Sequence, residues 1–117
     1  MPRVLLIEDD PLVAKPTVRV LEKAGARQVD WAPTPATALA QCDNASYDFL
    51  VSDFDLGPSE RNGVDLLGEL RTTSHPEAVF VCISASPRQV PGWVAFVSKL
   101  DLADGMTALI QDWDASG

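Results

Sequence analysis

The stretch that decides the fold is residues 4–11, VLLIEDDP. Four consecutive apolar residues, Val4 to Ile7, are followed by three acidic residues and a proline. A continuous apolar run of this length is typical of a β-strand buried on both faces, as in a parallel sheet covered by helices. The acidic residues therefore mark the end of a buried strand.

The residues after this strand repeat with helical spacing. Between Pro11 and Ala24, apolar side chains recur at intervals of three and four, and Gly25 supplies a stop signal. Pro16 lies inside this pattern and should kink or delay the first turns, because it lacks a backbone N–H. A helix is therefore expected after the first strand.

The same alternation of strand and helix patterns continues to the end of the chain. Further strands are expected at 28–31, 49–51, 78–83 and 94–97, further helices at 36–42, 64–70 and 102–113, and a turn-rich loop at 57–63. This alternation predicts one α/β domain over residues 1–117, a doubly wound five-stranded parallel sheet with helices on both faces.

Composition excludes several classes of protein. Nine Lys and Arg residues against 17 Asp and Glu give a net charge of −8, which argues against a nucleic-acid-binding surface. No apolar run approaches the roughly 18 residues of a membrane span, and the N-terminus does not resemble a signal peptide. Cys42 and Cys82 favour two buried thiols in a reducing compartment. We expect a cytoplasmic protein with neither a nucleic-acid nor a membrane partner.

Polar residues fall where the predicted strands end. Glu8 and Asp9 follow the first strand, Asp53 closes the third, Ser84 the fourth and Lys99 the fifth. The carboxyl ends of parallel strands meet at one edge of the sheet, so these side chains should share one crevice. Crowded carboxylates favour a proton or a hard divalent cation such as Mg²⁺. Such a site suits Asp53 as a nucleophile toward a phosphoryl group, with Lys99 and Ser84 contacting the phosphoryl oxygens.

At this point the chain resembles the receiver domains of two-component response regulators. The resemblance covers nearly all of the sequence and rests on an ordered set of motifs. These are residues 4–11, YDFLVSD at 47–53, NGVDLL at 62–67, Ser84-Ala85, and Phe96 three residues before Lys99. It implies the flavodoxin-like strand order 2-1-3-4-5.

The resemblance also implies a role for individual residues. Glu8 and Asp9 match the acidic pair that binds Mg²⁺, and Asp53 matches the phosphoacceptor. The backbone carbonyl of Asp55 matches a further metal ligand. The remaining roles are the switch hydroxyl, the rotating aromatic residue and the charge partner of the phosphoryl group, which fall on Ser84, Phe96 and Lys99.

The expected function is therefore a signalling receiver rather than an enzyme. A histidine kinase or a histidine phosphotransfer protein would donate the phosphoryl group, and phosphorylation would change binding to a downstream protein partner or relay the group onward. One alternative is a phosphorylation-independent adaptor or dimerisation module. Another is a phosphatase resembling haloacid dehalogenases, suggested by Asp53-Phe54-Asp55, although little chain remains for a cap and a second acidic site.

Two features depart from the pattern of this family. Leu100 stands where the family usually has a proline in a cis peptide. Because a cis bond before a non-proline residue costs about 2.5–4 kcal/mol, we expect a trans peptide, which leaves the direction of Lys99 open. In addition, residues 85–93 are too few for a full helix, and they contain Pro87, Pro91 and Gly92. The fourth helix is therefore expected to be short or absent.

Three other residues have ordinary structural interpretations. His75 stands alone before Pro76, which is typical of a surface loop. Trp93 is expected to fill the space left by the missing helix, with an exposed interface anchor as the alternative. Asp10 is as suited to capping the following helix as to binding metal.

Overall fold

The computed structural model describes residues 1–58 and 60–116. Ser59, in the turn-rich loop predicted at 57–63, and Gly117 lie outside the described residues. The described residues form a five-stranded parallel sheet in the order β2-β1-β3-β4-β5, as predicted. The strands are β1 Arg3–Ile7, β2 Gln28–Ala32, β3 Phe49–Asp53, β4 Val79–Ser84 and β5 Val94–Ser98.

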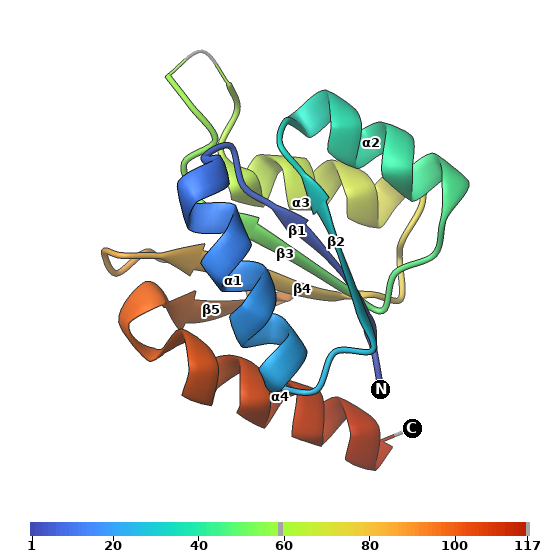
Figure 1. Ribbon diagram of the computed structural model, residues 1–117. Helices are drawn as coiled ribbons and strands as arrows, with labels where there is room; N and C mark the ends of the chain where they lie inside the picture. Colours follow the sequence, from blue (N-terminus) through green and yellow to red (C-terminus); the bar gives the residue numbers. More distant parts are fainter. Residues whose placement is uncertain (59, 117) are drawn as a thin grey trace.

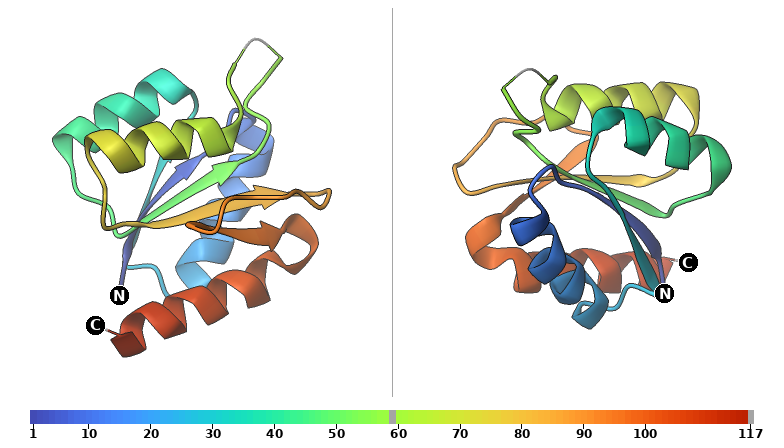
Figure 2. Two further views of the ribbon diagram at one scale, coloured as in Figure 1. Left: turned by 180° about the vertical axis from the view of Figure 1, so that it is seen from behind. Right: turned by 45° about the horizontal axis from the view of Figure 1, so that its top comes forward.

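Helices cover both faces of the sheet. In the described residues these are α1 Pro11–Lys23, α2 Pro35–Asn44, α3 Gly63–Thr73 and α4 Leu102–Ser116, with a short 3₁₀ helix, η1, at Lys99–Asp101. Helices α2 and α3 pack on one face, and α1 and α4 pack on the other (Figures 1 and 2). The doubly wound architecture is therefore the one expected from the alternating pattern.

The continuous apolar run of β1 is explained by these two layers. Leu5 and Ile7 belong to the core beneath α2 and α3, whereas Val4 and Leu6 belong to the core beneath α1 and α4. Side chains alternate between the faces of a strand, so a central strand needs apolar residues at every position. This double burial places Glu8 at the edge of the sheet, directly after the buried run.

The connection between β4 and β5 contains no helix, which confirms the prediction for residues 85–93. Trp93 packs edge-on against Phe80, with ring centroids 5.4 Å apart, and joins the core beneath α2 and α3. The Arg71 guanidinium from α3 lies 4.8 Å from the centre of the Trp93 ring. Trp93 therefore fills part of the space that a fourth helix would occupy.

The prediction for His75 is wrong. Only 7% of its surface is exposed, and its Nε2 accepts a hydrogen bond from the backbone N–H of Tyr47 at 3.1 Å. The turn after α3 folds over the start of β3, and burial lowers the pKa of His75. A single histidine before a proline carries no periodic signal that would reveal such long-range packing.

Predictions for the cysteines and for the peptide bond after Lys99 are confirmed. Cys42 and Cys82 are both buried and free. Every described peptide bond is trans, including the one between Lys99 and Leu100. None of the described helices has the length and apolar character needed to span a membrane.

Candidate functional site

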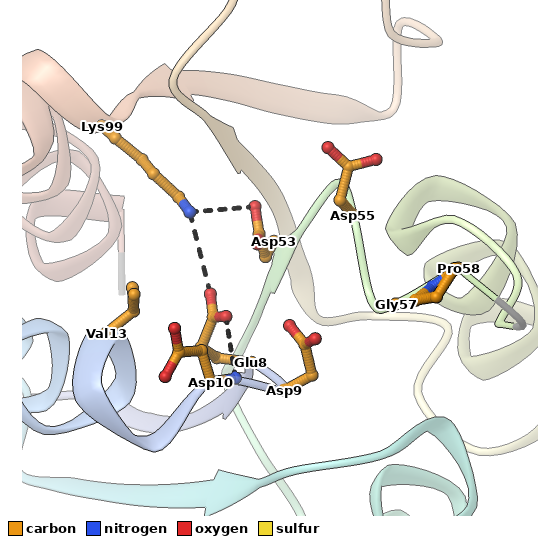
Figure 3. A pocket seen from close by; sticks show the side chains of 9 residues that line it. All are labelled: Glu8, Asp9, Asp10, Val13, Asp53, Asp55, Gly57, Pro58 and Lys99. Atoms are coloured by element: carbon orange, nitrogen blue, oxygen red, sulfur yellow. Dashed lines mark hydrogen bonds and ion pairs between the residues drawn. The ribbon is translucent and has the colours of Figure 1, made fainter.

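The strand ends surround a cavity of about 460 Å³ at the carboxyl edge of the sheet (Figure 3). Its walls come from the ends of β1, β3 and β5, the start of α1 and the loop after β3. The lining residues are Glu8, Asp9, Asp10, Val13, Asp53, Asp55, Gly57, Pro58 and Lys99. Segments far apart in the sequence thus bring five acidic side chains to one crevice.

Three of these carboxylates form a compact cluster. Glu8, Asp9 and Asp53 each offer an oxygen, and these oxygens lie within 4.8 Å of one another. Glu8 and Asp53 are buried, whereas Asp9 is exposed. Burial, reinforced by the charge of Asp53, raises the pKa of Glu8 to about 8. The two buried acids and one accessible acid are a donor set for a hard cation.

The hydrogen bonding of Glu8 supports the same interpretation. Its Oε1 accepts a hydrogen bond from the backbone N–H of Asp10 at 3.2 Å. Its Oε2 is buried without a hydrogen-bond partner among the described residues. Buried polar atoms almost always have a partner, so an oxygen of this kind beside two other carboxylates fits a metal ligand.

Lys99 supplies the positive charge of the cavity. Its Nζ lies 3.3 Å from Asp53 Oδ1 and 3.9 Å from Glu8 Oε2. In Figure 3 the side chain extends across the cavity toward both acids. The trans peptide before Leu100 therefore does not prevent Lys99 from reaching Asp53.

The backbone around Asp53 is held by short contacts. The Phe54 N–H donates to the Ile83 carbonyl at 2.9 Å, and the Gly63 N–H donates to the Phe54 carbonyl at 2.8 Å. The Ser52 hydroxyl donates to the Asp53 carbonyl at 2.8 Å. These bonds tie the end of β3 to β4 and to the start of α3, so Asp53 stands on a rigid support.

The response regulator receiver domain family matches residues 4–95 of the chain. This chain belongs to that family. The match covers the strand ends that carry Glu8, Asp9, Asp53 and Ser84. A search among curated proteins found none that matches the chain.

Solved structures of other receiver domains share the fold. A CheY-like receiver domain from Methylobacillus flagellatus is 21% identical with a TM-score of 0.81, covering 96% of this chain and 98% of that one. The receiver domain of the hybrid histidine kinase CckA is 24% identical with a TM-score of 0.75, covering 94% and 96%. The response regulator PhyR from Brucella abortus is 24% identical with a TM-score of 0.76, covering 98% of this chain and 50% of PhyR.

The two residues predicted to switch this receiver domain lie outside the cavity lining. Ser84 is buried at the end of β4, where its hydroxyl accepts a hydrogen bond from the Ser86 N–H at 3.3 Å. Phe96, in β5, pairs with Cys82 of β4 and is partly exposed. Strand alternation places Phe96 on the same face as Val94, beneath the position of the missing helix. The absence of that helix explains its exposure.

Asp10 and Asp55 line the cavity in different ways. Asp10 caps α1, because its Oδ1 accepts a hydrogen bond from the Leu12 N–H at 2.9 Å. Asp55 follows β3 and is largely exposed, with its carboxylate 3.6 Å from Arg88. The metal-binding role of the Asp55 carbonyl remains a prediction.

Sequence reasoning missed three residues that support this receiver site. Ser52 and Gly63 hold the backbone of Asp53 and Phe54, and the Trp31 indole N–H donates to the Glu8 carbonyl at 2.7 Å. Ser52 and Gly63 stand within the motifs at 47–53 and 62–67, but those motifs indicated only a strand end and a turn and gave neither residue a role. Trp31 also packs against the core beneath α1 and α4.

Proposed function

We propose that Asp53 of this receiver domain accepts a phosphoryl group from a phosphohistidine donor. The observation that carries the proposal is the convergence of Glu8, Asp9, Asp53 and Lys99 in one open cavity. The donor would be a histidine kinase or a histidine phosphotransfer protein. The phosphorylated domain would then bind a downstream protein partner differently or relay the phosphoryl group.

The chemistry assigns a task to each of these side chains. A carboxylate oxygen of Asp53 attacks phosphorus, the bond between phosphorus and the donor imidazole breaks, and its electron pair stays on the imidazole nitrogen. Lys99 offsets charge on the phosphoryl oxygens. Glu8, Asp9, Asp53 and the Asp55 carbonyl would hold Mg²⁺, which neutralises phosphoryl charge when bound.

The test is incubation with acetyl phosphate and Mg²⁺, followed by intact-mass measurement. We expect the wild type to gain the mass of one phosphoryl group and Asp53→Asn to gain none. Asp43→Asn is the matched control, because it removes an exposed carboxylate on α2, outside the cavity, and should be phosphorylated like the wild type. An equal mass gain in Asp53→Asn would overturn the assignment of the phosphoacceptor.

We also propose that the domain is not a turnover enzyme. A receiver becomes phosphorylated once per molecule, whereas a phosphatase of the kind suggested by Asp53-Phe54-Asp55 would hydrolyse an added phosphomonoester repeatedly. Sustained release of inorganic phosphate from p-nitrophenyl phosphate, lost in Asp53→Asn, would favour the phosphatase.

The absence of a helix in residues 85–93 favours one alternative, an adaptor or dimerisation module that works without phosphorylation. Beryllofluoride with Mg²⁺ separates the two functions, because it mimics a phosphoryl group on an aspartate. A receiver should respond through the fluorescence of Trp31, which is bonded to Glu8, or of Trp93. No response, together with identical oligomeric state and partner binding in Asp53→Asn, would favour the adaptor.

A further inference from the structure

The shortened β4–β5 connection carries one charged residue, Arg88, which lies close to the residues that follow Asp53. Arg88 is the only charged residue in the sequence between Ser84 and Val94. Its guanidinium carbon lies 4.2 Å from the centre of the Phe54 ring, and its Nη2 lies 3.6 Å from Asp55 Oδ2. Arg88 thus contacts both residues that directly follow Asp53.

Asp55 has little else to hold its side chain. The carboxylate is 76% exposed, and residues 55–57 belong to no helix or strand. Among the described residues, Arg88 is the one polar side-chain partner of this carboxylate. Phe54, in contrast, is held by two backbone hydrogen bonds as well as by the stacked guanidinium. Arg88 therefore links the exposed side chain of Asp55 to Phe54, whose backbone is hydrogen-bonded on both sides.

Arg88 also changes the charge balance at the cavity. Five acidic side chains line it, and Lys99 is the one cationic residue in that lining as described. A phosphoryl donor is an anion and is repelled by exposed carboxylates on its approach. The guanidinium beside Asp55 offsets one of these charges from outside the lining.

We propose that Arg88 is a positioning residue for phosphoryl transfer to Asp53. It stacks on Phe54 and pairs with Asp55, which places the Asp55 carbonyl toward the metal site and neutralises the Asp55 side chain. This inference rests on the proposed function of Asp53. It assigns to the β4–β5 connection a role in forming the site, in addition to covering the core.

The first experiment measures Mg²⁺ binding by tryptophan fluorescence in the unphosphorylated protein. Loss of the Arg88 charge by itself would strengthen Mg²⁺ binding, because it removes a cation beside the acidic cavity, so weaker binding reports the loss of positioning. Because the ion pair and the cation–π contact are each worth a modest energy, loss of positioning in Arg88→Gln should weaken Mg²⁺ binding about fivefold. Arg88→Lys, which keeps the charge and loses the planar stack, should fall between Arg88→Gln and the wild type.

Arg71→Gln is the matched control. Arg71 makes the same kind of contact with Trp93 at the other end of the connection, away from the cavity lining. Both variants should lower the unfolding midpoint slightly without Mg²⁺, but only Arg88→Gln should change Mg²⁺ affinity. If the Mg²⁺ affinity of Arg88→Gln stays within about twofold of the wild-type affinity, the inference is overturned. A twofold change is smaller than the contribution of one exposed contact at the upper end of its range.

The second experiment follows phosphorylation by acetyl phosphate over time. Arg88→Gln should slow the reaction by about the same factor as it weakens Mg²⁺ binding, and should have no further effect in an Asp55→Asn background. A wild-type phosphorylation rate in Arg88→Gln would overturn the positioning role of Arg88 and leave the proposed function of Asp53 intact. Failure of the wild type to react would instead overturn the proposed function, and the Mg²⁺ titration would still decide whether Arg88 positions the loop.

Discussion

Glu8 shows at the scale of a single residue how burial and neighbouring charge act on an acid of the cavity. It has 2% of its surface exposed, and Lys99 Nζ lies 3.9 Å from its Oε2. Burial and the neighbouring Asp53 raise its pKa to about 8, so the carboxyl is mostly protonated at neutral pH without a metal. Binding of a cation would displace this proton, which couples metal affinity to pH.

This pKa predicts how Glu8 affects stability. A carboxyl whose pKa is raised on folding contributes stability at low pH that is lost as pH rises, here between the ordinary value of 4.5 and about 8. The loss is roughly 1.4 kcal/mol for each pH unit within that window. We therefore expect Glu8→Gln, without divalent cations, to become more stable relative to the wild type as pH rises.

Urea unfolding of both proteins at about pH 5 and about pH 8 checks this prediction. The difference between the two proteins is the relevant quantity, because the lowered pKa of His75 changes the stability of both in the same way. A difference in unfolding free energy that is independent of pH would show that Glu8 is ionised throughout.

At the scale of elements, the start of α3 supports the end of β3, which carries Asp53. A Cβ at Gly63 would lie 2.1 Å from the Asp53 carbonyl oxygen and 2.6 Å from Ser52 Oγ. Helix α3 can therefore approach β3 this closely only because residue 63 has no side chain. The same close approach permits the hydrogen bond from the Gly63 N–H to the Phe54 carbonyl.

Two glycines of the same helix should respond to alanine in opposite ways. Gly63→Ala should destabilise the fold by roughly 1–3 kcal/mol, because α3 must move away from Asp53. At Gly68 a Cβ meets only Trp93, at 3.7 Å, so Gly68→Ala should stabilise by roughly 0.5–1 kcal/mol. Chemical unfolding measures both changes, and a neutral Gly63→Ala would contradict the close packing.

At the scale of the whole molecule, the acidic cavity lies at one end of the sheet of a chain with net charge −8. The turn that buries His75 lies near the start of β3, at the opposite end. A cation that binds only the folded protein stabilises the entire domain by mass action, wherever it binds.

Millimolar Mg²⁺ should therefore raise the unfolding midpoint more than NaCl of equal ionic strength does. The difference should disappear in Asp9→Asn and persist in Asp43→Asn, whose carboxylate lies outside the cavity. Thermal unfolding followed by circular dichroism, with EDTA added to reverse the effect, measures it. Equal midpoints in Mg²⁺ and NaCl would indicate general screening of charge.

The sequence by itself determined the architecture and the edge of the sheet at which Glu8, Asp9, Asp53 and Lys99 meet. Apolar runs such as Val4 to Ile7 and helical repeats such as the one after Pro11 are local patterns. Each indicates which side chains of its own segment are buried. Parallel strands align their carboxyl ends, so the order of elements alone brought Glu8, Asp53 and Lys99 to one edge. The small number of residues between Ser84 and Val94, with two prolines and a glycine among them, predicted that the fourth helix is missing.

Only the tertiary structure decided how the side chains meet. The reach of Lys99 to Asp53, the burial of His75 against Tyr47 and the contact of Arg88 with Phe54 and Asp55 all join residues remote in sequence. Each depends on distances of a few ångströms set by packed neighbours, and no local pattern of residue types carries that information.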